Sequence, residues 1–219
     1  GFGGKRQVAA GPLGAVAFVS RFILHLGSVH ASPGEGPQTP LNANPLRIAC
    51  VGLPGSGKST VGRHLARKMG LRFIDSDQVI EQRIACSIRE FFEREGENAF
   101  RDIEQQVIDE LTQGQSCVLS SGGGTVLRAA NRQHLRERSQ VVYLHSIPEE
   151  VFRRLRHDQN RPLLQVADPL ARLRDLYAAR DPLYRETAHF VIETGRPSVS
   201  TLVNMILMQL ELAGLLPPR

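Results

Sequence analysis

GLPGSGKST, residues 52–60, directly follows the apolar run LRIACV at residues 46–51. The stretch matches the pattern G-x-x-x-x-G-K-[ST] at every fixed position. It also lies in the context that this pattern requires, because the helical pattern VGRHLARKM follows at 61–69. The sequence therefore predicts a phosphate-binding loop between a buried strand and a helix.

The residue types in this loop suit a nucleoside triphosphate with Mg²⁺. Glycine lets phosphate oxygens approach backbone N–H groups closely, and the N-terminus of the following helix favours an anion. We expect Lys58 to reach the β- and γ-phosphates and Ser59 to bind Mg²⁺. The set expected at the nucleotide is Gly55, Ser56, Gly57, Lys58, Ser59 and Thr60. The alternative is a glycine-rich turn with a chance lysine.

Five apolar runs alternate with segments of helical spacing, and they lie at 46–51, 71–75, 116–120, 140–145 and 189–193. This alternation predicts an α/β fold in three layers, with a parallel sheet covered by helices on both faces. We expect one domain at 45–219, which is long enough to bury a core.

Three short patterns mark expected helix starts. SIRE at 87–90 and SIPE at 146–149 both fit a capping box, the second with proline at an early helical position. The dipeptide DP at 168–169 fits an N-cap followed by proline.

Residues 1–44 differ in composition from the rest of the chain. They combine a start rich in Gly, Ala and Pro, the semi-apolar stretch LGAVAFVSRFILHL and linker-like residues. We expect an extension that is disordered or accessory. An organellar transit peptide and a secretory signal are the alternatives.

The composition of the chain restricts which kinds of binding partner are expected. The formal net charge is +5, and 24 of the 27 basic residues are arginines, which are spread along the sequence. This spread argues against a nucleic-acid partner, whereas arginine suits anionic ligands. No run of apolar residues indicates a membrane span. Cys50 and Cys117 lie in apolar runs, so we expect buried thiols in a reducing compartment, the cytoplasm.

Phosphoryl transfer also needs an acceptor held in line with the moving phosphate. Asp75 and Asp77 end the second apolar run, and we expect them to serve different partners. One carboxylate is expected to hold Mg²⁺ through water. The other is expected to accept hydrogen bonds from substrate hydroxyls or to take the proton of the attacking one. The alternative is that either aspartate caps the following helix.

Two further features are candidates for acceptor binding. SGGG at 121–124 follows the third apolar run, and consecutive glycines are costly unless their backbone lies against a ligand. A flexible turn is the alternative. The candidate cations are Arg101, Arg161 and Arg180, although a single arginine is more often a solvated surface residue.

Taken together, the chain from Leu46 onward resembles the shikimate kinase family. The matching stretches, in order, are GLPGSGKST, FIDSD, SIREFFEREGENAFRDIE, SGGG, NRPLL and RDPLYRETA. The long SIxExFxxxGExxFRxxE run with GGG and RPLL is the specific part. The resemblance implies a nucleoside monophosphate kinase fold with strand order 2-3-1-4-5. It also implies transfer of the γ-phosphate of ATP to the 3-hydroxyl of shikimate.

The resemblance implies roles on the acceptor side. Asp77 resembles the carboxylate that grips the shikimate hydroxyls, and it is the candidate base. Arg101 and Arg180 match the arginines on the shikimate carboxylate, which a planar guanidinium binds through two hydrogen bonds. The remaining members of this set are the backbones of Gly122, Gly123 and Gly124.

On the nucleotide side, the lysine and serine of the loop keep the roles given above, and Asp75 is implied near Mg²⁺. Arg161 resembles a lid arginine that swings onto the phosphates, within a lid at about 157–167. The residues at the positions where the family sandwiches adenine are Arg154 and Pro197.

The expected ligands are therefore ATP or ADP and shikimate, with Mg²⁺ as cofactor and a monomer as the family precedent. A related small-molecule kinase such as gluconate kinase is the runner-up, but it is not expected to carry SGGG and RDPLY together with Arg101. An inactive relative acting as a scaffold is predicted to lack Lys58, Ser59 or Asp77, and all three are present.

Overall fold

The computed structural model describes residues 45–156 and 166–217. Its strands form one parallel sheet in the order β2-β3-β1-β4-β5, as the resemblance implies. The strands are β1 Arg47–Val51, β2 Arg72–Asp75, β3 Cys117–Ser120, β4 Gln140–His145 and β5 Phe190–Glu193. Each strand lies within one residue of a predicted apolar run, so the predicted fold class is confirmed.

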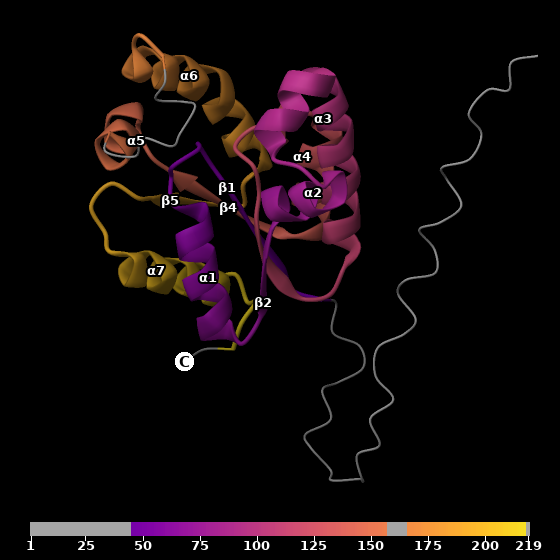
Figure 1. The fold of residues 1–219 in the computed structure, drawn as a ribbon. Helices are drawn as coiled ribbons and strands as arrows, with labels where there is room; N and C mark the ends of the chain where they lie inside the picture. The colour runs from indigo at the N-terminus through magenta and orange to yellow at the C-terminus, as the bar shows by residue number, and fades with distance from the viewer. Residues whose placement is uncertain (1–44, 157–165, 218–219) are drawn as a thin grey trace, which may run out of the picture. The chain divides into compact units, whose positions relative to one another are not determined.

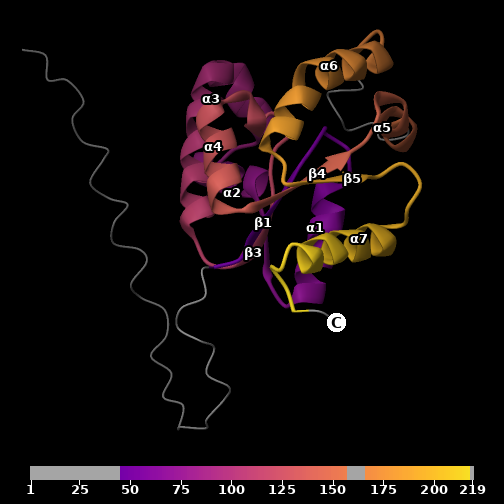
Figure 2. The ribbon, with the colours of Figure 1, turned by 180° about the vertical axis from the view of Figure 1, so that it is seen from behind.

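Helices cover both faces of the sheet, with α1 and α7 on one face and α3 to α6 on the other (Figures 1 and 2). The helical segments of the described ranges are α1 Lys58–Met69, α2 Ser76–Ile84, α3 Ile88–Gln113, the 3-10 turn η1 Thr125–Leu127, α4 Ala129–Arg138, α5 Pro148–Leu155, α6 Pro169–Thr187 and α7 Val199–Leu212.

The central strand β1 contributes to two separate hydrophobic clusters. Ile48 and Cys50 pack under α1 and α7, whereas Ala49 and Val51 pack under the helices of the opposite face. Successive side chains of a strand point to opposite faces, so a strand covered on both sides is apolar throughout. This explains why the run before the phosphate-binding loop shows no polar alternation.

Two of the three predicted helix starts are confirmed. Ser87 and Glu90 form a reciprocal capping box at α3, and Asp168 accepts a hydrogen bond from Ala171 N at α6. α3 runs on to residue 113 but is interrupted at Gly96, which has φ 84° and ψ 173°.

The predicted capping box at 146–149 is wrong. α5 begins at Pro148, and Ile147 occupies its N-cap without a side-chain hydrogen bond. The Ser146 hydroxyl is instead bonded to Thr194 Oγ1 and accepts from Arg154 Nη1 at 3.3 Å. The Ser146 hydroxyl, which the local sequence predicted to cap α5, is therefore used in a tertiary contact.

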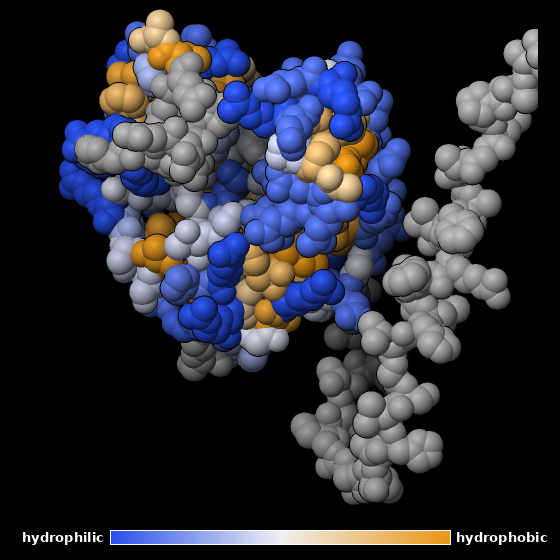
Figure 3. All heavy atoms as spheres, in the orientation of Figure 1, coloured by the Kyte–Doolittle hydropathy of each residue, from blue (hydrophilic) through white to orange (hydrophobic). Residues whose placement is uncertain are grey.

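The surface seen in Figure 3 is mostly hydrophilic, with small apolar groups between charged side chains. Within the described ranges, no helix has the length and apolarity needed to cross a membrane. Cys50 and Cys117 are buried as expected, and burial raises the pKa of the Cys50 thiol to about 12.

Candidate active site

The loop between β1 and α1 needs its glycines for two physical reasons. Gly55 and Gly57 have φ values of 82° and 94°, in the left-handed region that favours glycine. A Cβ on Gly55 would also lie 2.5 Å from Leu155 Cδ1. The loop ends at α1, whose N-cap is Gly57, so the predicted strand, loop and helix follow one another.

Lys58 begins α1 and places its ammonium back against the loop. The residue is 8% exposed, and its Nζ donates to the carbonyl oxygens of Gly52 at 3.0 Å and Leu53 at 2.9 Å. Lys58 also lines a cavity of about 410 Å³ at the carboxyl ends of the strands. A largely buried cation thus lies beside a cavity. Electrostatic attraction between this cation and an anionic ligand is stronger there than in open water.

Ser59 and Asp75 join α1 to the end of β2. The Ser59 hydroxyl donates to Asp75 Oδ2 at 2.8 Å, and its Oγ lies 3.2 Å from Ser120 Oγ at the end of β3. Asp75 Oδ1 accepts from Asp77 N at 3.1 Å, so Asp75 also caps α2, as the structural alternative predicted. These are hard oxygen donors of the kind that Mg²⁺ uses.

Asp77 lies in the first turn of α2, one helical step beyond the strand, and it lines the same cavity as Asp75. Burial, and then the negative charge of Asp75, raise the pKa of Asp77 to about 6, while Lys58 acts in the opposite direction. A carboxyl group with a pKa near the working pH is suited to general base catalysis.

The glycines at 122–124 lie against three groups of the site. A Cβ on Gly122 would be 2.7 Å from Asp77 Oδ1, and one on Gly123 would be 2.7 Å from Pro54 Cδ. On Gly124 it would be 2.4 Å from Arg101 Nη2. The backbone N–H of Gly122 is already used, because it donates to Ser76 Oγ at 3.1 Å. The glycines are therefore explained by close packing rather than by a flexible turn.

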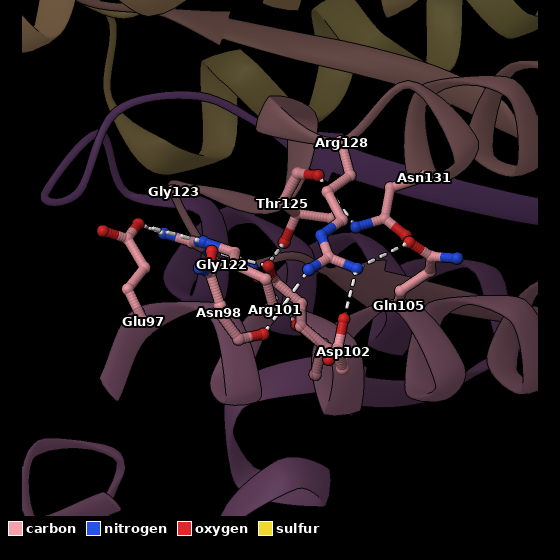
Figure 4. A network of polar contacts seen from close by, with 12 residues as sticks. Glu97, Asn98, Arg101, Asp102, Gln105, Gly122, Gly123, Thr125, Arg128 and Asn131 are labelled. Carbon is pink, nitrogen blue, oxygen red and sulfur yellow. Dashed lines mark hydrogen bonds and ion pairs between the residues drawn. The ribbon is translucent and has the colours of Figure 1, made fainter. Parts of the chain in front are cut away.

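Arg101 on α3 lies against this glycine loop (Figure 4). Its guanidinium donates to Glu104 Oε2 at 2.7 Å and to Glu97 Oε1 at 3.1 Å. The side chain of Arg101 is 11% exposed, and that of Glu104 is only 1% exposed. Glu104 also accepts from Thr125 Oγ1 at 2.7 Å, which ties α3 to the end of the glycine loop.

Arg180 on α6 reaches the same loop from the other side. Its Nη1 donates to the Gly123 carbonyl oxygen at 3.1 Å, and the Tyr184 hydroxyl donates to the same oxygen. Burial raises the pKa of Tyr184 to about 12, and the charges of Arg180 and Arg101 oppose that shift. Both predicted arginines therefore lie near one tyrosine and one glycine loop.

A smaller cavity of about 200 Å³ adjoins the other side of the phosphate-binding loop, and both Arg154 and Pro197 line it. Arg154 donates to the Ser56 carbonyl oxygen at 3.5 Å and to the Thr194 carbonyl oxygen at 2.7 Å. The two residues expected at adenine thus lie together next to the expected phosphate site.

The larger cavity gathers most of the predicted loop and carboxylate residues, and its lining is Pro54, Gly55, Gly57, Lys58, Ser59, Thr60, Asp75, Asp77, Ser120, Ser121, Gly123 and Leu155. Arg101 and Arg180 are not in its wall but contact the glycine loop that lines it. Arg161 and most of the expected lid at 157–167 lie outside the described residues.

Sequence reasoning missed two residues that hold the arginines. Glu104 was part of the FRxxE pattern, where its spacing of three from Arg101 places both on one helical face. Tyr184 lies four residues after Arg180 and is buried. Nothing in the sequence around it indicated that its hydroxyl would bond to the glycine loop.

Comparisons with known proteins agree with one another. A family model described as shikimate kinase matches residues 54–211. A shikimate kinase of Paracidovorax citrulli is 65% identical over 187 residues, covering 84% of this chain and 98% of that protein. One from Ralstonia nicotianae is 58% identical over 168 residues, covering 77% of this chain and 88% of that protein.

Solved structures give the same result. The shikimate kinase from Acinetobacter baumannii in complex with shikimate is 47% identical, with a TM-score of 0.73, and the match covers 78% of this chain and 94% of that one. A gluconokinase from Sinorhizobium meliloti, at 19% identity and a TM-score of 0.51, shares the fold alone. With the matched residues spanning the phosphate loop, the paired aspartates and both arginines, the chain belongs to the shikimate kinase family.

Proposed function

We propose that this chain transfers the γ-phosphate of ATP to the 3-hydroxyl of shikimate within the 410 Å³ cavity. The family's reaction is the phosphorylation of shikimate by ATP. One observation supports the assignment to these residues. The cavity has Lys58 of the phosphate-binding loop and the carboxylate of Asp77 in the same wall, next to a glycine loop that two arginines contact.

On the nucleotide side, the phosphates of ATP lie on the loop at 52–60 and the adenine lies between Arg154 and Pro197. Lys58 exchanges its carbonyl partners for phosphate oxygens and balances the charge that develops on them. Arg161 is proposed to add a second cation from the lid, on the resemblance alone.

The residues near the loop fit Mg²⁺. The Ser59 hydroxyl and the Asp75 carboxylate supply hard oxygen ligands, directly or through water. Within the described ranges, no group of three or more His, Cys, Asp or Glu residues is arranged to hold a metal ion by itself. Mg²⁺ needs no such group when substrate phosphates complete its shell. When bound, the ion supplies positive charge to the transferring phosphoryl group.

On the acceptor side, Arg101 and Arg180 hold the shikimate carboxylate beside the glycine loop. Within the part of the chain that the structure describes, no carboxylate pairs with Arg180. Its guanidinium therefore has donors to offer a small carboxylic acid. Arg101 shares its donors between this ligand and Glu104.

Asp77 binds and activates the acceptor hydroxyl. The ionised carboxylate accepts the hydroxyl proton while the oxygen forms its bond to the γ-phosphorus. The bond from that phosphorus to the bridging oxygen of ADP breaks, and the proton leaves on Asp77. A pKa of about 6 leaves most of this carboxyl ionised at neutral pH. We expect the enzyme to be a cytoplasmic monomer, and its three free cysteines suit a reducing compartment.

The decisive test is a coupled assay of ADP release with Mg-ATP against shikimate, gluconate and CMP. Turnover with shikimate alone is expected, and NMR of the product is expected to show phosphate on the 3-oxygen. Turnover with gluconate alone would overturn the proposal and favour the runner-up. ATP binding without turnover of any acceptor would instead support the role of an inactive scaffold.

A further inference from the structure

A polar cluster lies between β4 and α6, outside the cavity. It consists of Tyr143 and His145 of β4 with Tyr177 and Asp181 of α6, and we call it the β4–α6 cluster. Tyr143 is fully buried, and the side chains of His145 and Asp181 are 8% and 17% exposed. Buried polar groups are costly unless they are bonded, so a cluster of this kind fixes geometry strictly.

The first contact of the cluster is between Tyr143 and Asp181. The Tyr143 hydroxyl donates to Asp181 Oδ1 at 2.8 Å, while Asp181 Oδ2 accepts from Arg185 Nε at 2.9 Å. Burial and the nearby carboxylate raise the pKa of Tyr143, so its hydroxyl remains a donor at every working pH. The Tyr143 ring also packs against Tyr184, with centroids 5.0 Å apart.

The second contact is between His145 and Tyr177. His145 Nδ1 lies 2.6 Å from Glu193 Oε2, and a carboxylate only accepts, so Nδ1 carries a proton. In the neutral ring, Nε2 then accepts the hydroxyl proton of Tyr177 at 2.9 Å. Strands β4 and β5 together therefore hold one turn of α6 through this histidine.

Four residues on one face of α6, at the spacing i, i+3, i+4 and i+7, link this cluster to the acceptor site. Tyr177 and Asp181 are four residues apart and face β4. Arg180 and Tyr184 are also four residues apart, and both donate to the Gly123 carbonyl oxygen. Rotation or sliding of α6 on β4 would carry Arg180 away from the glycine loop.

We propose that the β4–α6 cluster is a positioning device that sets where Arg180 meets the carboxylate of the acceptor. This inference rests on the proposed role of Arg180. None of its four residues lines the cavity, so they act through the arginine. Preorganised groups lose affinity when their support is loosened, even if the fold persists.

The test is initial-rate kinetics of the full chain with shikimate and ATP varied separately. Tyr143→Phe removes one hydroxyl, and Asp181→Ala removes its acceptor. Each is expected to raise KM for shikimate about 2- to 13-fold, the effect of losing the hydrogen bond between Tyr143 and Asp181, with little change in kcat or in KM for ATP. Asp181→Asn keeps an acceptor oxygen and is expected to restore most of the affinity.

A matched control separates positioning from general stability. Glu186→Ala removes another carboxylate of α6, one that makes an exposed ion pair with Arg132 at 3.3 Å. This variant is expected to keep the KM for shikimate of the parent protein. Equal effects of Asp181→Ala and Glu186→Ala on KM would overturn the inference.

Arg180→Ala separates this inference from the function on which it rests. It is expected to raise KM for shikimate strongly, and Tyr143→Phe is then expected to add nothing in its background. A strong effect of Arg180→Ala combined with unchanged KM in Tyr143→Phe and Asp181→Ala would overturn the positioning role alone. Unchanged KM in Arg180→Ala would overturn the proposed acceptor site and the positioning role with it.

Discussion

Lys58 donates to two carbonyl oxygens of its own loop, and these are the partners that we propose a phosphate group replaces. Lys58→Met keeps the length of the side chain and removes the charge. We expect kcat to fall at least about 100-fold, because the transferring group loses a preorganised cation. Lys68→Met, at an exposed position of the same helix, is the control in the ADP-release assay. Parental kcat in Lys58→Met would exclude the role.

The raised pKa of Asp77 predicts the shape of the pH profile. The ionised form, which is proposed to act as the base, predominates above pH 6 and is lost as the pH falls through 6. We expect kcat/KM for shikimate to decline below about pH 6 with a slope of one. Asp77→Asn is expected to lower kcat by about 10²- to 10⁴-fold and to abolish the decline of kcat/KM below pH 6. ATP affinity, measured by calorimetry, should stay near the parental value; its collapse would place Asp77 in the metal site.

Arg101 is predicted to contribute to affinity for the acceptor. Arg101→Ala removes the cation that is proposed to pair with the shikimate carboxylate. We expect it to weaken shikimate binding by about 2–4 kcal/mol, which is roughly 30- to 1000-fold in Kd. Direct titration of shikimate measures this. The variant is also expected to melt at a lower temperature, because Glu104 loses its cation while 1% exposed. An unchanged Kd would contradict the assignment.

At the scale of elements, the glycine loop is a surface against which two site residues are packed. Gly124 has an ordinary φ of −98°, so alanine is tolerated by the backbone there. Its Cβ would nevertheless meet Arg101 Nη2 at 2.4 Å and push the guanidinium away. We expect Gly124→Ala to raise KM for shikimate about 10-fold or more without a comparable change in KM for ATP.

Gly114→Ala is the matched control for this variant. Gly114 also has a negative φ, −73°, and its Cβ would lie at an acceptable 3.4 Å from the Leu111 carbonyl oxygen. Kinetic constants equal to those of the parent are expected. If both alanine variants behave alike, packing against the loop does not set the position of Arg101.

The strands and most helix starts were predictable from the sequence. Strands buried on both faces appear as apolar runs, and a helix cap depends on residues that are close together in the sequence. The box at Ser87 was correct since its two residues need only each other. The box at Ser146 failed because Thr194, 48 residues away, uses the same hydroxyl. A local pattern cannot reveal a competing hydrogen-bond partner that the fold brings in from a distant segment, here the residue just after β5.

For the candidate site too, local features could be predicted from the sequence, whereas features that depend on the fold could not. The residues expected around the phosphates form a contiguous motif, so their proposed chemistry follows from the sequence alone. The pKa of Asp77 was not, because it depends on burial and on the distances to Asp75, Lys58 and Glu104, which only the fold determines. The support of Arg180 by β4 was equally hidden, since Tyr143 and Asp181 are separated by 38 residues.

For the molecule as a whole, the ionised Asp77 is a cost to stability. Its pKa is about 6 in the folded protein, whereas an aspartate free of such surroundings has a pKa of 3.8, so the folded state binds more protons between these values. The free energy of unfolding therefore falls as the pH rises from about 4 to 6. At pH 7 we expect Asp77→Asn to be more stable than the parent by about 1–3 kcal/mol, and at pH 3, below both pKa values, the difference should nearly vanish.

Urea unfolding of the ligand-free protein at the two pH values measures this difference. Asp175→Asn, at an exposed position of α6, is the control and should change stability little at either pH. A loss of stability in Asp77→Asn at pH 7 would show that the carboxylate is held by favourable contacts rather than strained by its neighbours.

The placement of Lys58 also has a practical consequence for attaching the protein to dyes or surfaces. The sequence holds three lysines, and of the two in the described ranges Lys68 is exposed while Lys58 is 8% exposed and bonded to two carbonyls. An amine-reactive ester should therefore modify Lys68 and spare the phosphate loop. Immobilised or fluorescent enzyme prepared by this chemistry is expected to retain its nucleotide site without any protecting ligand.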